Sequence, residues 1–154
     1  MVVMANEVEP ELVKELFEEL QSERFVTIAT IDHETGGPNV SAISWLLAKD
    51  EQTILFAADS RSRIIENIRG NGLVVITLVA NESTYSIQGR AKIIVDNIED
   101  VPLKLALVKL EITEVRDVMF YGSKIVTEPM YDKIYDHNAS ARLDTQVMNA
   151  IKKA

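Results

Sequence analysis

Short runs of β-branched and other apolar residues, separated by turn residues, dominate the chain from residue 25 to residue 121. The runs that predict strands are residues 25–32, 39–48, 53–58, 73–79, 83–95 and 108–121. Several of the links are tight turns, such as residues 33–37, and tight turns join antiparallel neighbours because a parallel crossover needs a dozen or more residues. The sequence therefore predicts a mostly β fold, a six-stranded antiparallel barrel or sandwich with helices at its periphery.

Helical spacing of apolar residues predicts the peripheral helices. Residues 9–22 have Pro10 at the first helical position, followed by leucines three or four residues apart. Residues 62–70 have an apolar stripe of isoleucines and end at a Gly-Asn-Gly stop signal. Residues 97–107 are a candidate for a further short helix, and residues 128–153 form a C-terminal segment with helical spacing.

One domain is expected over residues 1–154, with the barrel at 24–122, because single domains usually have roughly 100–200 residues. No linker, low-complexity tract or internal repeat interrupts the chain. No apolar run approaches the roughly 20 residues of a membrane-spanning helix, and the start MVVMANEVEPEL lacks the layout of a signal peptide. We therefore expect a cytoplasmic protein without a membrane partner.

Composition excludes several classes of function. Without cysteine the chain has no disulfide scaffold and no thiolate site, and with two histidines no metal site is expected. The net charge of −8 disfavours nucleic acid as a partner, since an acidic chain repels a polyphosphate backbone. The glycine-rich nucleotide-binding motifs and the Gly-x-Ser-x-Gly motif of hydrolases are absent. The sequence thus identifies no catalytic residue.

A cluster of arginines marks the junction between the strand at 53–58 and the helix at 62–70. Arg61, Arg63 and Arg69 lie within nine residues, beside serines that can cap the helix. A helix N-terminus offers free N–H groups and a partial positive charge, so arginines and hydroxyls there make a site for a phosphomonoester. The alternative is structural: Ser60 or Ser62 only caps the helix, and the arginines pair with Asp59 and Glu66. Both interpretations remain open.

The second candidate feature is the segment Ser41-Ala42-Ile43-Ser44-Trp45. A strand that mixes small, polar and aromatic residues can lie against a flat ring, with backbone groups at the polar edge of that ring. The alternative is that Trp45 is a core residue and the serines face water.

The chain from Arg24 to about Asp96, about half of its length, resembles the FMN-binding split barrels related to pyridoxamine 5′-phosphate oxidase. It resembles a general stress protein-like branch more than a true oxidase. The matching pieces are residues 25–30, 37–45, 54–58, 62–63, 67–71 and 87–91. Their spacing along the chain carries the resemblance more than any single motif does.

This resemblance implies a six-stranded split barrel that forms a homodimer, with FMN in a cleft between the subunits. It implies that Ser62 and Arg63 hold the FMN phosphate and that Ala57 and Ala58 flank the phosphate and the ribityl chain. The residues implied along the isoalloxazine ring are Ala42, Ile43, Ser44 and Trp45. Such a cofactor carries the chemistry itself, which fits a chain with no obvious catalytic residue.

Three departures from the oxidases shape the functional expectation. Ile64 stands where they have a lysine, a charge that Arg61 could supply from the other side, and Thr84 stands where a glutamine is expected. The resemblance therefore makes Arg61 and Thr84 candidate cofactor contacts as well. The last third of the chain does not match the arginine and histidine pattern with which the oxidases bind substrate. Pyridoxamine phosphate is therefore not the expected substrate.

We expect an FMN-binding flavoprotein, an oxidoreductase that acts on an unidentified small molecule. One alternative keeps this class and replaces FMN with a deazaflavin, which also carries a phosphate. Another is a non-catalytic flavin-binding or stress-related protein with a degenerate pocket.

Overall fold

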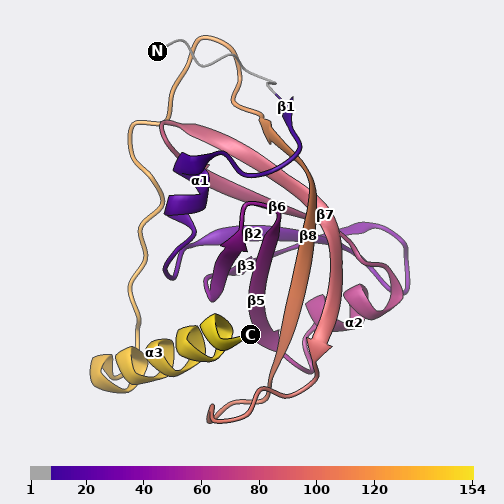
Figure 1. The fold of residues 1–154 in the computed structure, drawn as a ribbon, viewed down its shortest axis with the longest axis vertical. Helices are drawn as coiled ribbons and strands as arrows, with labels where there is room; N and C mark the ends of the chain where they lie inside the picture. Colours follow the sequence, from indigo (N-terminus) through magenta and orange to yellow (C-terminus); the bar gives the residue numbers. More distant parts are fainter. Residues whose placement is uncertain (1–7) are drawn as a thin grey trace.

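The β-branched runs form one antiparallel sheet in the computed structural model, which describes residues 8–154 (Figure 1). The strands are β1 (Val8–Glu9), β2 (Val26–Ile31), β3 (Pro38–Ile43), β4 (Leu46–Asp50), β5 (Thr53–Asp59), β6 (Leu73–Ala80), β7 (Ser83–Val95) and β8 (Leu105–Asp117). Hydrogen bonding gives the order β3-β2-β6-β7-β8-β5-β4, and β1 pairs with the end of β8. Since β3 and β4 follow each other in the chain, the sheet closes on itself through Ser44 and Trp45. The expected mostly β, antiparallel fold of a split barrel is confirmed.

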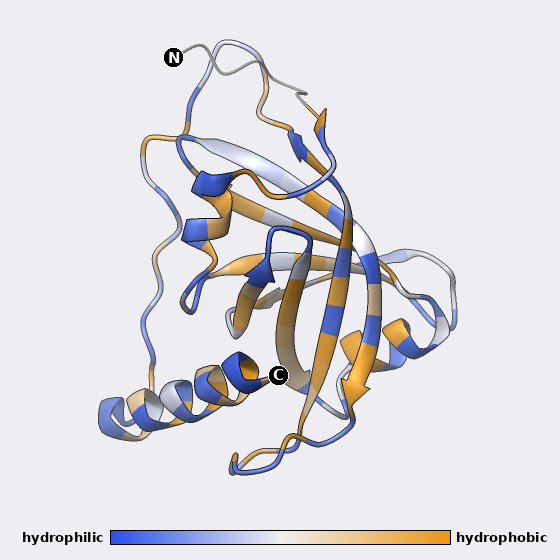
Figure 2. Cartoon of the chain, in the orientation of Figure 1, coloured by the Kyte–Doolittle hydropathy of each residue, from blue (hydrophilic) through white to orange (hydrophobic). Residues whose placement is uncertain are grey.

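Hydrophobic and hydrophilic residues alternate along several strands (Figure 2). The apolar residues of this pattern fill the interior of the barrel. β2 and β6 alternate between buried and half-buried residues, so that one face of each supplies the core. Leu16 of helix α1 (Lys14–Glu19) and its flanking residues Leu12 and Leu20 add to this core, and helix α2 (Arg63–Gly70) adds its isoleucine stripe. The predicted helix at 62–70 is confirmed, with Ser62 as its N-cap.

A second core lies on the outer face of β4, β5 and β8, beneath helix α3 (His137–Lys153). Val147, Met148 and Ile151 of this helix pack against leucines of the three strands. β5 is therefore covered on both faces, which explains why its sequence is an unbroken apolar run.

The strand predicted at 39–48 is divided into β3 and β4, and β1 is an additional strand. The division falls at Ser44, whose carbonyl accepts hydrogen bonds from the N–H groups of Arg24 and Leu46. The chain must change direction here, because β3 pairs with β2 whereas β4 pairs with β5. Within residues 8–154 the sheet thus has eight strands, where the sequence predicted six.

The helix predicted at 9–22 is shorter and begins at Lys14, because Val8 and Glu9 pair with Arg116 and Val115 of β8. The candidate helix at 97–107 is wrong: its last residues open β8 and pair with β5, and Pro102 lacks the N–H that a helix interior needs.

In the C-terminal segment predicted at 128–153, only residues from His137 onward are helical. The Asp136 carboxylate caps α3 by accepting a hydrogen bond from the N–H of Ala139 at 2.9 Å. Between residues 8 and 154, no helix is long and apolar enough to cross a membrane.

Candidate functional site

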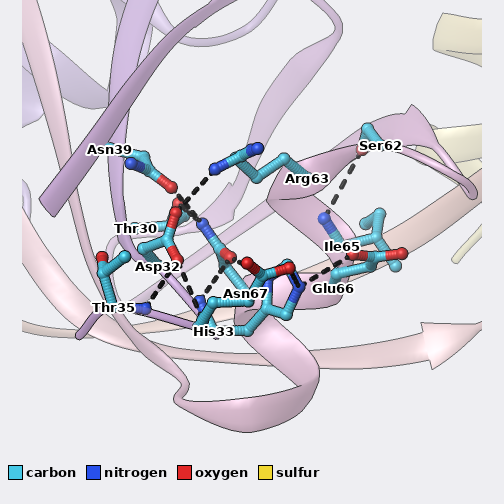
Figure 3. Close-up of polar contacts among 11 residues, drawn as sticks. Thr30, Asp32, His33, Thr35, Asn39, Ser62, Arg63, Ile65, Glu66 and Asn67 are labelled. Atoms are coloured by element: carbon cyan, nitrogen blue, oxygen red, sulfur yellow. Dashed lines mark hydrogen bonds and ion pairs between the residues drawn. The ribbon is translucent and has the colours of Figure 1, made fainter. Parts of the chain in front are cut away.

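The predicted phosphate site lies where β5 leads into α2 (Figure 3). The Ser62 hydroxyl accepts a hydrogen bond from the N–H of Ile65 at 3.4 Å, and the Ser62 carbonyl accepts one from Glu66. The N–H groups of Arg63 and Ile64 occupy the first turn and have no carbonyl partner within the helix. The junction therefore presents backbone donors and a hydroxyl together.

The two arginines of the junction are held by aspartates. Arg63 Nη1 donates to Asp32 Oδ2 at 2.6 Å, although 65% of the Arg63 side chain is exposed. The backbone N–H of Arg61 donates to Asp59 Oδ1 at 2.8 Å, and its Nε lies 3.5 Å from the same oxygen. The pairing of Arg61 with Asp59 matches the structural alternative, whereas Arg63 pairs with Asp32 rather than with Glu66. A guanidinium has five N–H donors, so Arg63 keeps donors beyond the bond to Asp32.

Asp32 follows β2 and is almost completely buried. Backbone hydrogen bonds from Thr35 and Glu34 hold its pKa at about 2, well below the ordinary 3.8, and the charge of Arg63 lowers the pKa further, against the opposing effect of burial. The carboxylate is therefore ionised at neutral pH and fixes Arg63 beside the turn after β2.

Asn67, fully buried on α2, ties this helix to the β2–β3 hairpin. Its Nδ2 donates to Thr30 and to Asn39, each at 2.9 Å, and its Oδ1 accepts from the backbone N–H of His33 at 2.9 Å (Figure 3). His33 Nδ1 also lies 2.9 Å from this oxygen. The hydrogen bond to Asn67 raises the pKa of His33, as do Glu66 and Glu34, against the effect of burial. This network fixes where α2 begins.

A pocket of about 300 Å³ joins the α2 junction to the closure of the barrel. Its lining residues are Ala42, Ile43, Ser44, Trp45, Ala57, Ala58, Asp59, Ser62, Ile64 and Lys133. Seven of the ten residues predicted to contact a cofactor thus meet in one pocket. Arg61 and Arg63 stand beside it without lining it.

Thr84 lies elsewhere in the same chain. Its carbonyl accepts a hydrogen bond from the N–H of Val118, just beyond the end of β8, whereas Asp59 pairs with Leu105 at the start of β8. A separate pocket of about 830 Å³ lies near Thr84, between the β6–β7 turn and residues 117–124. Within a single copy of the chain, Thr84 is therefore far from the α2 junction.

Ser44 and Trp45, where the barrel closes, form hydrogen bonds with acidic residues outside the strands. Trp45 Nε1 donates to Asp144 Oδ1 of α3 at 2.9 Å, and Ser44 Oγ donates to Glu23 Oε2 at 3.0 Å. Trp45 is only partly buried, against the outer core, and so is not a residue of the barrel interior. Trp45 therefore lines the pocket while it packs against the outer core.

Lys133 is the lining residue that the sequence did not reveal. It reaches the pocket from the segment before α3, and its Nζ donates to Glu23 Oε2 at 3.0 Å and to Asp144 Oδ1 at 3.2 Å. No local pattern predicts a contact between residues 110 positions apart in the chain. Asn67 was also missed, but a signal existed: it lies three residues after Ile64, on the apolar face of its helix.

The family described as Pyridoxamine 5′-phosphate oxidase matches residues 12–119. The chain belongs to this family. Members generally bind a flavin or a related cofactor. The match ends before the segment that carries Lys133.

Solved structures share the fold at low identity. HupZ of Group A Streptococcus is 16% identical and has a TM-score of 0.58, over 75% of this chain and 100% of that chain. A structure titled F420 Reductase is 19% identical, with a TM-score of 0.55, over 67% and 98% of the two chains. General Stress Protein 26 from Bacillus anthracis is 16% identical, with a TM-score of 0.52, over 66% and 92%. No curated protein matches the sequence.

Proposed function

We propose that this protein is an FMN-binding flavoprotein, an oxidoreductase that acts on a small molecule. The observation that carries the proposal is that one pocket joins the start of α2, where a phosphate is favoured, to the Ala42–Trp45 wall, where a ring is favoured. When bound, FMN would supply the hydride or electron transfer itself, and the protein would bind and orient it.

At the phosphate end, the donors are the first-turn amides of α2, the Ser62 hydroxyl and the arginines beside them. Asp59 also lines this end, and the backbone N–H of Arg61 lowers its pKa, so it carries a negative charge. Arg61 lies next to that carboxylate, and its exposed side chain is free to turn toward a phosphate. This is the role proposed for Arg61 in a chain where Ile64 replaces a lysine.

At the ring end, small residues leave room for a planar group. Ala42 has no bulk beyond Cβ, so a ring can lie close to the backbone there, and Ala57 and Ala58 leave similar room for the ribityl chain. Trp45 and Ser44 are fixed by Asp144 and Glu23, so this wall is already in place before a ligand binds. A preformed wall supports the proposal that Ala42–Trp45 lie along the isoalloxazine ring.

We also propose a homodimer in which the partner completes the site. Thr84 cannot reach the α2 junction of its own chain, so its predicted contact with the cofactor requires a second copy. Large apolar side chains are exposed after β8, as a surface buried between copies would require: Phe120, Tyr121, Val126, Met130 and Ile134.

The first test is the visible spectrum of the purified protein, before and after FMN is added and the excess removed. We expect retained flavin bands. Arg63→Ala and Arg61→Ala should each weaken FMN binding roughly tenfold or more, since hydrogen bonds to charged groups contribute about 1.5–3 kcal/mol. Binding of riboflavin, which lacks the phosphate, should change little.

Arg69→Ala is the matched control, because Arg69 pairs with Asp96 at the other end of α2 and should leave FMN binding unchanged. If Arg63→Ala binds FMN as tightly as the parent, the phosphate assignment is wrong. If the parent retains no flavin, FMN is not its cofactor.

Two alternatives remain. The structural similarity to a protein titled F420 Reductase favours a deazaflavin as the alternative cofactor, and the absorbance maximum of the bound cofactor separates the two. The other alternative, a non-catalytic protein with a degenerate pocket, predicts no thermal stabilisation by FMN. A true ligand at 100 times its dissociation constant should add about 2.7 kcal/mol.

A further inference from the structure

Residues 120–136, which make up most of the segment between β8 and α3, are here called the C-terminal strap. It lies outside the family match and runs along one side of the barrel to α3 (Figure 1). Glu128 anchors it through Arg24 at 2.6 Å, and the ring of Tyr131 lies 6.2 Å from that of Phe25. These contacts carry the strap past the closure of the barrel.

Lys133 is the strap residue that enters the proposed cofactor pocket. Its side chain is 23% exposed, and its Nζ lies 5.9 Å from the centre of the Trp45 ring and 5.6 Å from that of Tyr131. An ammonium has three N–H donors. Within residues 8–154, two of them are used, by Glu23 and Asp144, so one donor remains for a ligand.

The position of this ammonium is fixed by the carboxylates that also fix the pocket wall. Glu23 accepts from Ser44 as well as from Lys133, and Asp144 accepts from Trp45 as well as from Lys133. Burial lowers the pKa of Lys133, but its hydrogen bonds to Glu23 and Asp144 outweigh burial and raise the pKa overall. Lys133 is therefore a charged donor held at the Ser44–Trp45 end of the pocket.

We propose that Lys133 contacts the ligand directly, donating its third N–H to an acceptor atom on the polar edge of the bound ring. The inference rests on the proposed function and deepens it, because it assigns the charge nearest the ring to a residue outside the family match. A cation at a flavin ring favours the reduced form, which carries more negative charge on that edge. Lys133 thus shifts the pocket toward the reduced cofactor, against the negative charges of Glu23 and Asp144 beside it.

The test compares Lys133→Met with the parent, using dissociation constants for oxidised FMN and, under anaerobic conditions, for reduced FMN. We expect both affinities to fall, and that for reduced FMN to fall about tenfold further, in line with a lost hydrogen bond to a charged group. Lys133→Arg should restore part of the preference for the reduced form. Lys14→Met is the matched control, since Lys14 is an exposed lysine of α1 that pairs with Glu18 and does not line this pocket.

A merely structural role for Lys133 would lower both affinities by the same factor, so an unchanged ratio overturns the proposal. If Lys133→Met fails to fold, Glu23→Gln replaces it: with one carboxylate neutralised, Lys133 should favour reduced FMN more strongly, and no change in the ratio overturns the proposal. A parent that binds no FMN contradicts the proposed function as well. A parent that binds FMN, with a ratio insensitive to these variants, contradicts this inference alone.

Discussion

Asn67 shows how a single buried side chain can position the helix of a proposed binding site. Its amide satisfies partners on β2, on β3 and in the turn between them, and its helix supplies the cap and free amides of the proposed phosphate site. Because buried polar groups are costly to leave unpaired, the amide fixes both the angle and the register of α2 against the barrel.

Replacement of Asn67 by leucine should destabilise the protein by about 3 kcal/mol, because Thr30, Asn39 and His33 would lose a buried partner. Chemical denaturation measures this change. The control is Asn71→Ala, at an exposed position after the helix, which should cost about 1 kcal/mol or less. A loss no larger than that of the control would contradict the role given to Asn67.

His33 makes the same region sensitive to pH. Its pKa is raised above the ordinary 6.5, chiefly by Asn67 and then by Glu66 and Glu34, so the folded state binds the proton more tightly than the unfolded chain. Its contribution is complete below pH 6.5 and is lost as the pH rises through the raised pKa. The difference in unfolding free energy between the parent and His33→Gln should shrink as the pH rises from 6 to 8. A difference that grew over this range would refute the assignment.

At the scale of elements, the β6–β7 hairpin closes with two residues in the left-handed region. Asn81 has φ of 50° and Glu82 has φ of 63°, between the paired residues Ala80 and Ser83. Such turns match the twist of a hairpin, and asparagine tolerates them, whereas glutamate is strained there. The turn is thus a place where the local sequence and the fold disagree.

Glu82→Gly should stabilise the protein by about 0.5 kcal/mol, since the relief of strain exceeds the entropy that glycine loses on folding. Glu82→Ala tests the loss of the exposed pair with Lys124 without relieving φ, and should be neutral or slightly destabilising. Thermal melts of the three proteins decide between these outcomes. A glycine variant no more stable than the alanine variant would show that φ is not what limits the turn.

At the scale of the whole molecule, two properties oppose each other: exposed apolar residues on the strap favour a second copy, and the net charge of −8 repels it. Sedimentation should give about twice the chain mass of 17.2 kDa, with an equilibrium that shifts toward dimer as salt screens the repulsion. Phe120→Ser should shift it toward monomer, whereas Val40→Ser, at an exposed position on β3, is the control. A monomer at all salt concentrations would contradict the proposed dimer.

Local sequence determined the barrel strands and α2. Residues 26–31 alternate between buried and half-buried, and Ser62 caps a helix whose isoleucines recur on one face. Each pattern depends only on neighbours a few positions away. The sequence could likewise indicate the region from Ala42 to Ser62 as a candidate site. Both parts of the pocket wall lie on strands, or at a helix start, that have clear sequence patterns.

Tertiary structure alone decided three features: the division of the predicted strand at Ser44, the pairing of Arg63 with Asp32, and the position of Lys133 in the pocket. Each depends on the closure of the sheet or on where α3 docks, and so on contacts between residues far apart in the chain. Short-range patterns predict which face of an element is buried, but not which residues pack against that face. The charge next to the proposed ring, which is set by such contacts, therefore became visible only in the folded molecule.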